Sequence, residues 1–239
     1  MTGIQEPANI EQYVRDTWGD ANSCMPPDAR AQRVVDHVNE QLGTAGVPSV
    51  AWRFNAAHGT GAVFSFTDWT MELGESPYSM DVADNATPDQ QAWQISAVYH
   101  EARHSEQWFR MARERIGLGA STADVVQVTA IPQWVVDIAA QNPITQCDAS
   151  QYEAEQWYDS VYGAGAAARN TTLGNVQGNY SAYRSLPEES DAWRTGDAVT
   201  QQYHATNIPE GAQRSDDGHW WWDGSAWQPV SGAAAASHD

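Results

Sequence analysis

The longest helical pattern in the chain covers residues 88–116. Apolar residues lie on most sides of its middle, and no Gly or Pro interrupts it after the first position. Thr87 is a suitable N-cap, Pro88 fits the first helical position, and Gln90 completes a capping box three residues after the cap. Gly117 provides the stop. A helix that is apolar on most sides is expected to be buried, so this segment should form the centre of the fold.

Three other segments show the spacing of apolar residues that predicts helices. Residues 28–42 end at a glycine, residues 121–140 are interrupted at Pro132, and residues 150–168 contain two glycines near their end. The polar stretch 170–179 that follows predicts a loop. The chain is therefore expected to be mostly helical.

Two short runs rich in branched and aromatic residues predict strands. Residues 50–54 and 62–66 are separated by the turn-prone segment 56–61, and the second run continues to Leu73 with period-two alternation. Together with the helices, these runs predict an α+β fold with a small sheet beside the long helix.

The C-terminal part of the chain differs in composition from the rest. Residues 208–217 are Pro, Gly and polar, which is typical of a linker between a domain of residues 1–207 and a Trp-rich segment of residues 218–230. An Asp-Gly pair between aromatic runs there predicts a hairpin with a two-residue type I′ turn. A lone hairpin is marginal in water, so it should dock on the main domain or on a partner. The Ala-rich residues 231–239 are expected to be frayed.

The charge balance disfavours two classes of partner. The 239 residues carry 12 basic and 31 acidic side chains, for a net charge of −19 and a pI near 4.4. Such a chain is repelled by nucleic acid and by anionic membrane surfaces. Charged residues make up only 18% and there are 12 Trp, so the chain is expected to fold and not to form an acidic disordered tail.

Targeting signals and cysteines are sparse. No apolar run approaches the roughly 20 residues of a membrane span, and acids such as Glu6 and Glu11 occupy the region where a signal peptide would be basic and then apolar. We therefore expect synthesis and folding in the cytoplasm, with any export by a route that needs no cleavable signal. Cys24 and Cys147 could form one disulfide or stay free, and the absence of a C-x-x-C pair disfavours a cysteine metal cluster.

Candidate chemistry lies inside the long helix, at His100-Glu101-Ala102-Arg103-His104. The pattern is H-E-x-x-H, and a spacing of four places both histidines on one helix face, where they can bind one metal ion. Glu101 lies about 100° around the helix, where its carboxylate can reach the water of that metal. The arrangement indicates zinc-dependent hydrolysis. The alternative is two surface histidines and a glutamate on an exposed turn.

A third zinc ligand is expected from a later helix, because catalytic zinc usually takes three protein ligands and leaves a fourth position for water. The first turn of a helix that begins with Pro187 contains three acids, Glu188, Glu189 and Asp191. Glu189 is favoured because the small Ala192 one turn on allows two helices to approach closely. Glu188 and Asp191 are alternatives, and acids in a first turn also complement the helix dipole without any metal.

Four further side chains are candidates for the same site. Tyr183 and Tyr180 could donate a hydrogen bond to a developing oxyanion, although a tyrosine is more often a packing residue with its hydroxyl at the surface. His204 is a candidate as a metal ligand or as an oxyanion donor. His58, in a predicted loop, could be a ligand, but an isolated loop histidine is more often solvated.

Two short motifs resemble a known family. They are Tyr99–Phe109, with an H-E-x-x-H-x-x-Q core, and Tyr183–Trp193, with the pattern Y-x-x-L-P-x-E-x-D-A-W. They are similar to bacterial metallopeptidases associated with extracellular contractile injection systems. The resemblance covers roughly residues 60–200 and implies a zincin-like α+β fold, zinc, peptide hydrolysis and a role as a secreted or injected effector. It also implies the roles of the site residues: His100, His104 and Glu189 as zinc ligands and Glu101 as the base.

One position weakens this resemblance. Arg103 departs from common zincins, which often carry an apolar residue there.

The tail motif from Trp222 to Trp227, W-D-G-x-x-W, separately resembles short modules of actinobacterial proteins, and we expect it to serve as an anchoring or loading segment.

Two function classes follow from these motifs. As a zinc peptidase, the protein would use Glu101 to move protons, and residues 61–73 could offer a strand edge to an extended peptide or merely cover the helix. The alternative is a non-catalytic interaction protein, braced by zinc and carried as cargo by an injection-system particle. A water at the fourth zinc position would indicate the enzyme, and a fourth protein ligand would indicate the structural site. A third interpretation keeps the zinc chemistry with a substrate other than peptide.

Overall fold

The computed structural model describes most of the chain: Ile4, Thr17 and residues 25–83, 85–146, 148–206, 212–215, 220–222 and 227–229. Its helices are α2 (Pro27–Thr44), α3 (Met80–Ala83), α4 (Pro88–Gly117), α5 (Thr122–Thr129), α6 (Gln133–Ala139), α7 (Gln151–Val161), α8 (Ala166–Leu173), α9 (Tyr180–Arg184) and α10 (Pro187–Thr206), with the short 3₁₀-helices η2 (Ala56–His58) and η3 (Ser76–Tyr78). Its strands are β1 (Ala51–Phe54), β2 (Ala62–Ser65), β3 (Thr70–Leu73), β4 (Trp220–Trp222) and β5 (Trp227–Pro229). The predicted α+β class, mostly helical with a small sheet, is confirmed.

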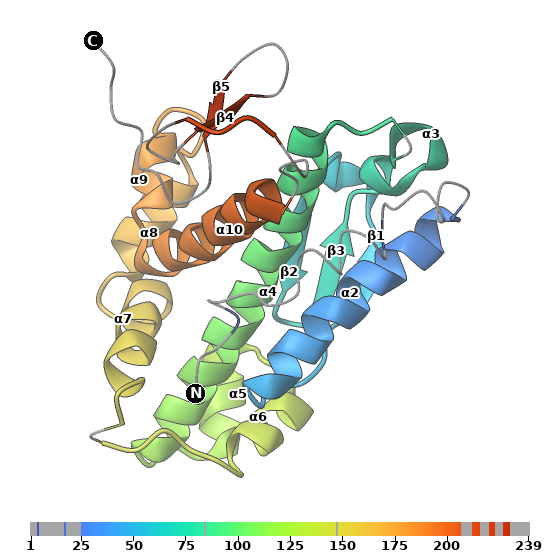
Figure 1. Cartoon of the computed structure of the whole chain (residues 1–239). Coiled ribbons are helices and arrows are strands. Elements are labelled where there is room, and N and C mark those ends of the chain that lie inside the picture. The colour runs from blue at the N-terminus through green and yellow to red at the C-terminus, as the bar shows by residue number, and fades with distance from the viewer. Residues whose placement is uncertain are drawn as a thin grey trace.

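The long helix α4 lies in the middle of the fold. Figure 1 shows α2 and the sheet on one side of it and α7 and α10 on the other. The predicted capping box is present: the Thr87 hydroxyl accepts from the Gln90 N–H at 3.3 Å, and Gln90 Oε1 accepts from the Thr87 N–H at 2.8 Å. Most residues of α4 are buried, as predicted, although Trp93 is 48% exposed.

The three-stranded sheet has the order β1-β3-β2, with β1 parallel and β2 antiparallel to β3. β2 is therefore an edge strand, and it packs against α4. The prediction of one continuous run from residue 62 to Leu73 was wrong, because the chain reverses at residues 66–69. Trp69 has a φ of 55° in this turn, and its buried indole donates to the carbonyl of Pro48 at 3.2 Å. Burial of a large side chain fixes this turn, and no Gly or Pro marks it in the sequence.

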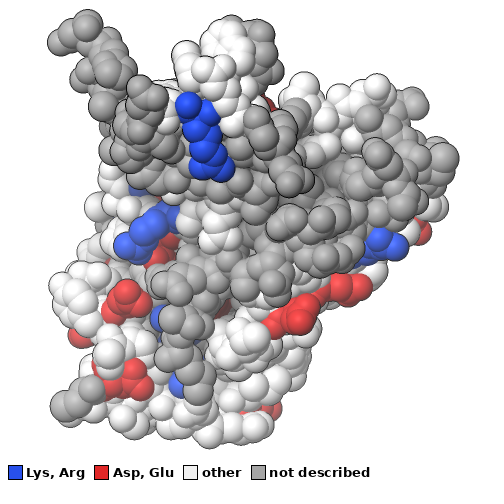
Figure 2. Space-filling model, viewed as in Figure 1, with Lys and Arg blue, Asp and Glu red and all other residues white. Residues whose placement is uncertain are grey.

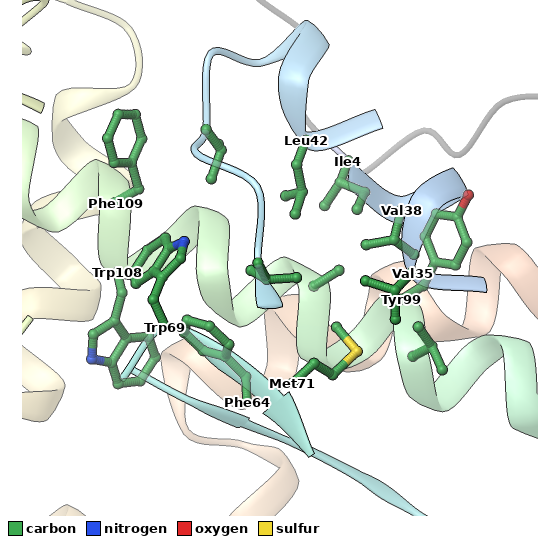
Figure 3. Packing of buried hydrophobic residues seen from close by; sticks show 14 of the residues in the cluster. Ile4, Val35, Val38, Leu42, Phe64, Trp69, Met71, Tyr99, Trp108 and Phe109 are labelled. Carbon is green, nitrogen blue, oxygen red and sulfur yellow. The ribbon is translucent and has the colours of Figure 1, made fainter. Parts of the chain in front are cut away.

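The hydrophobic core lies between α2, the sheet and α4. Figure 3 shows side chains of all three meeting there, among them Leu42, Met71 and Tyr99, with Ile4 beside them. Each fully buried aliphatic side chain contributes roughly 1.5–3 kcal/mol. The core therefore holds α4 firmly against the sheet and fixes the orientation of its opposite face.

The helices after α4 differ in part from the prediction. α5 and α6 lie on either side of Pro132, so the predicted interruption is confirmed. The segment 150–168 is not one helix, because α7 ends and α8 begins around its two glycines. α8 then continues to Leu173 and takes up the start of the predicted loop 170–179.

The C-terminal strands β4 and β5 form the predicted hairpin, with Trp222 paired to Trp227. Residues 223–226, which join these paired positions and include the predicted two-residue turn, lie outside the described residues. Part of the predicted linker, residues 213–215, hydrogen-bonds to β4. The rest of the predicted linker and the predicted frayed residues 231–239 lie outside the part of the chain that the structure describes.

Acidic side chains are visible in two regions of the face shown in Figure 2. They lie over α2 and over α7, and the basic side chains visible on this face are single and separated. Among the described residues, no helix combines the length and the apolar character needed to cross a bilayer. Cys24 and Cys147, the predicted disulfide candidates, lie outside the described residues.

Glu114, near the end of α4, is fully buried, and neither of its carboxylate oxygens has a hydrogen-bond partner among the described residues. Burial raises the pKa of this carboxyl above its ordinary 4.5; Arg115 opposes the rise, and Glu155 and Asp159 add to it. The unfolded state therefore loses this proton at lower pH than the folded state does. Stability should fall as the pH rises from about 4.5 to the raised pKa.

Glu114→Met is expected to raise the Tm by about 2–6 °C at neutral pH, because it removes a buried carboxylate that no hydrogen bond stabilises. The gain should shrink towards pH 4.5, where the native carboxyl is protonated. Differential scanning calorimetry at the two pH values measures both effects. Glu155→Met, at an exposed position of α7, is the control and should change the Tm little. A Tm of Glu114→Met at or below the native value at neutral pH would contradict this account.

Candidate metal centre

Three ligand atoms form a small triangle between α4 and α10. The Nε2 atoms of His100 and His104 lie 3.2 Å apart. Oε2 of Glu189 lies 3.4 Å from His100 Nε2 and 3.6 Å from His104 Nε2. In a tetrahedral zinc site with metal–ligand distances of about 2.0–2.1 Å, the ligand atoms are about 3.3–3.4 Å apart. The three side chains therefore have the spacing that one zinc ion requires.

The same carboxylate oxygen is also unpartnered. Glu189 is buried, and its Oε2 has no hydrogen-bond partner among the described residues although it faces two imidazole nitrogens. A buried carboxylate oxygen without a partner is costly, and a metal ion bound there would satisfy it. Two histidines and one glutamate are also a donor set that catalytic zinc sites use. The residues present fit zinc.

The close approach of α10 brings Glu189 to the histidines. α10 makes its most extensive packing with α4, and Ala192 is fully buried at that contact. At Gly196, one turn further on, a Cβ atom would lie 2.7 Å from the hydroxyl of Ser96 and 3.2 Å from its carbonyl oxygen. A larger residue here would have to move the Ser96 hydroxyl and crowd its carbonyl, so Ala192 and Gly196 allow the helices to approach closely.

Gln107 fixes the ring orientation of His104. Its side-chain NH₂ group donates to Asp191 Oδ2 and to the Glu188 carbonyl, each at 2.8 Å. Its Oε1 therefore faces His104 Nδ1, at 2.8 Å, and accepts the proton of that nitrogen. With that proton on Nδ1, Nε2 is the nitrogen that points to the triangle, and it can bind a metal once its own proton is displaced.

The charges of the site support the same arrangement. Burial lowers the pKa of His104, but the nearby carboxylates of Glu189 and Glu101 outweigh burial and raise it to about 9. Burial acts to raise the pKa of Glu189, and its contacts with His100 and His104 hold it well below its ordinary range. The site thus pairs a carboxylate with an imidazolium proton, and a metal ion that bound there would displace that proton.

Glu101 lies beside the triangle and faces the sheet. Its Oε2 accepts a hydrogen bond from the main-chain N–H of Phe64 on β2 at 2.8 Å, and its Oε1 lies 3.8 Å from His100 Nε2. Its side chain is 15% exposed, so solvent reaches it. Glu101 offers a metal an alternative carboxylate, since its ligand atoms and those of His100 and His104 lie within 4.8 Å of one another. Glu189 is the better ligand because its Oε2 lies nearer to the Nε2 atoms of both histidines, whereas Oε2 of Glu101 is bound to the Phe64 N–H.

Tyr183 lies next to the same carboxylates. Burial raises the pKa of its phenol well above the ordinary 10, and Glu189 and Glu101 raise it further. The phenol therefore keeps its proton and can donate it in a hydrogen bond. Tyr180 is half exposed and packs against Tyr183 and Trp193, with ring centroids 5.8 Å and 6.3 Å away.

The two other acids of the first turn of α10 are engaged elsewhere. Glu188 is paired with Arg169 on α8. Asp191 accepts from Arg103 Nε at 2.7 Å and from Arg194 at 2.6 Å. Both carboxylates are therefore neutralised by arginine, and the choice of Glu189 among the three acids agrees with the geometry.

Two histidines that were candidates lie away from the triangle. His204 is fifteen residues beyond Glu189 on α10, roughly 22 Å along the helix axis. Its imidazole faces Asp89 at 3.6 Å. His204 therefore lies too far from the triangle to serve as a ligand or an oxyanion donor there. His58 follows β1 and binds Glu72 on β3 at 2.7 Å, so it does not reach the site either.

Two groups that shape this centre received no functional role from the sequence patterns. Gln107 was part of the H-E-x-x-H-x-x-Q pattern but received no role, although its spacing of three from His104 is the signal for a contact on one helix face. The Phe64 N–H is a backbone group, and no side-chain pattern identifies it.

No protein-family model, curated protein or solved structure matches the chain. The centre is therefore interpreted from its own geometry.

Proposed function

We propose that the protein is a zinc-dependent hydrolase of peptide bonds with a zincin-like active site. The observation that carries this proposal is the triangle of His100 Nε2, His104 Nε2 and Glu189 Oε2, with sides of 3.2–3.6 Å. A second carboxylate, Glu101, lies beside the triangle and is not needed to complete it. A metal site with one such spare carboxylate is suited to hydrolysis.

The mechanism assigns separate tasks to these side chains. His100, His104 and Glu189 would hold the ion, which when bound lowers the pKa of water towards about 7 and polarises a carbonyl. Glu101 takes the proton of the attacking water through Oε1, because its Oε2 is occupied by the Phe64 N–H. Water oxygen then bonds to the carbonyl carbon, the C–N bond breaks, and Glu101 passes the proton to the leaving amine. Tyr183 donates a hydrogen bond to the oxyanion that develops on the carbonyl oxygen.

The edge of the sheet supports a peptide as the substrate. β2 is one of the two edge strands of the three-stranded sheet, and Glu101 already binds its outward-facing Phe64 N–H, which places this edge beside the catalytic carboxylate. Unpaired backbone groups on such an edge can bind an extended peptide as an added strand. A peptide bound there would pass directly by the spare carboxylate and the metal triangle.

Hydrolysis of a peptide mixture tests the proposal. The zinc-loaded protein is incubated with a proteome-derived peptide library, and mass spectrometry identifies the new termini. We expect cleavage that a chelator stops and added zinc restores. A protein that binds zinc at this site and cleaves none of the peptides would contradict peptide hydrolysis.

Tyr183→Phe is expected to lower kcat by about 100-fold with little change in KM or zinc affinity, since only the oxyanion hydrogen bond is removed. The matched control is Tyr180→Phe, which removes a hydroxyl from the neighbouring ring and should change kcat less than about twofold. Steady-state kinetics on one peptide measures both variants. Equal kcat values for the two variants would contradict the role of Tyr183.

A further inference from the structure

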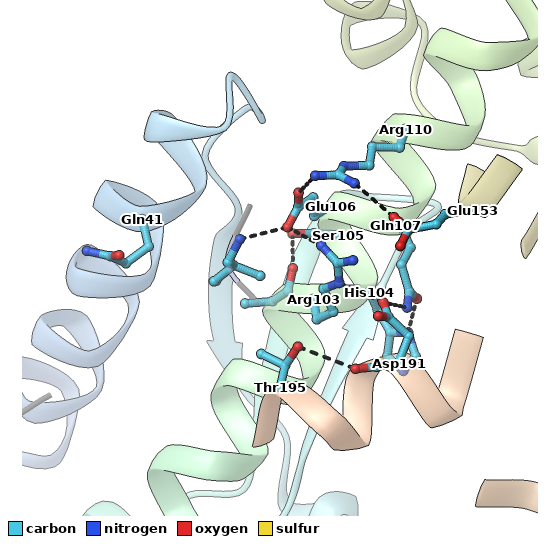
Figure 4. Close-up of polar contacts among 12 residues, drawn as sticks. Gln41, Arg103, His104, Ser105, Glu106, Gln107, Arg110, Glu153, Asp191 and Thr195 are labelled. Carbon is cyan, nitrogen blue, oxygen red and sulfur yellow. Dashed lines mark hydrogen bonds and ion pairs between the residues drawn. The ribbon is translucent and has the colours of Figure 1, made fainter. Parts of the chain in front are cut away.

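A cluster of buried charges lies behind the metal triangle, on the side of α4 that contacts α7 and Ile4. Its members, shown in Figure 4, include Arg103, Glu106, Arg110 and Asp191. Arg103 and Glu106 have no exposed surface, and Asp191 has almost none. Burying four charges is expensive, so their arrangement requires an explanation beyond general stability.

The cluster connects to a proposed zinc ligand through an unbroken series of hydrogen bonds. Arg103 Nε donates to Asp191 Oδ2 at 2.7 Å, and Gln107 Nε2 donates to the same oxygen at 2.8 Å. Gln107 Oε1 then accepts the Nδ1 proton of His104 at 2.8 Å. Arg103 is thus three hydrogen bonds away from His104 and touches neither the metal position nor the substrate side of the site.

Several groups fix Arg103 itself. Its NH1 donates to Glu106 Oε2 at 2.6 Å, and its guanidinium lies 5.2 Å from the ring centre of Trp157 on α7. The same Glu106 oxygen accepts from the Ile4 N–H at 2.9 Å, and Arg110 binds its other oxygen at 2.6 Å. Arg103 is therefore held from several sides and can act as a fixed support for Asp191 and so for α10.

We propose that Arg103 is a positioning residue of the metal centre, which acts through Asp191 and Gln107 to orient His104 and through Asp191 to hold α10 so that Glu189 reaches the triangle. This inference rests on the proposed function, since it assumes that the triangle binds zinc. It gives a physical reason for a charged residue at a position where zincins often carry an apolar one: the arginine links the ligand helix to the helix of the third ligand.

Zinc affinity of Arg103→Met tests the inference. Removing an outer partner of a metal ligand typically lowers metal affinity by about 10–100-fold, and we expect a loss in this range. The matched control is Arg110→Met, which removes a buried arginine from the same Glu106 but has no contact with Asp191. It should keep the zinc affinity within about threefold. Competition with a chromophoric chelator measures both, and the visible spectrum of the Co²⁺-loaded proteins should change for Arg103→Met only.

Arg103→Met leaves Asp191 without its main partner and could fail to fold. The double variant Arg103→Met/Asp191→Asn removes both charges, so it should fold and still bind zinc at least about tenfold more weakly than the native protein. Native zinc affinity and a native Co²⁺ spectrum in the folded double variant would overturn the inference. If the native protein binds no zinc, the proposed function fails; if native protein and Arg103→Met bind zinc equally, only the present inference fails.

Discussion

Glu101→Gln is expected to keep one zinc per chain and to lower kcat by about 10³-fold. The glutamine retains the shape of the side chain and can still accept the hydrogen bond from the Phe64 N–H. It cannot take a proton from water, and general-base catalysis contributes about 10²–10⁴-fold. Peptide hydrolysis and metal content, measured on the same sample, separate the loss of the base from the loss of the metal.

The same variant also decides between two roles of this carboxylate. If Glu101 were a zinc ligand and not a base, the substitution would lower zinc affinity, and the fall in kcat would be reversed by excess zinc. A kcat within about tenfold of the native value at full zinc loading would show that Glu101 is not the base.

Glu189→Gln is expected to weaken zinc binding by at least about 100-fold. Zinc binding energies of about 10–16 kcal/mol over four ligands correspond to roughly 2.5–4 kcal/mol for each ligand. The neighbouring Glu188→Gln is a close control, because both acids are buried in the same helical turn. Glu188 is paired with Arg169 and not with the histidines, so its variant should lose stability but keep zinc affinity within about threefold.

Titration of the apo proteins with zinc, followed by a competing chelator, measures these affinities. Weak binding by Glu188→Gln together with native binding by Glu189→Gln would exchange the roles of the two acids. Native binding by both variants would show that α10 supplies no ligand.

The sequence was sufficient where the information is local. The start of α4 depends on Thr87 and Gln90, which lie three residues apart, and the two histidines share a face because of the helical period alone. The preference for Glu189 also had a local basis, in the small Ala192 one turn on. These features need no knowledge of the tertiary structure.

Tertiary contacts explain what the sequence did not reveal. The turn at Trp69 is fixed by the burial of its indole, and no Gly or Pro marks it in the sequence. His204 was a candidate because the length of α10 was not known, and that length carries it away from the histidines. Gly196 marks the close approach of α10 to α4, yet in the sequence it resembles any helix-weakening glycine. Asp191 was a possible ligand until its contact with Arg103, 88 residues away, was visible.

The ligand set of the bound ion is the most direct test of the account. The zinc-loaded protein would be crystallised, and anomalous diffraction at the zinc edge would locate the ion and its neighbours. We expect one ion within about 2.0–2.2 Å of His100, His104 and Glu189, with water as the fourth ligand and Glu101 outside the coordination sphere. An ion with Glu101 as a fourth protein ligand, or no ion at this triangle, would contradict a hydrolytic zinc centre.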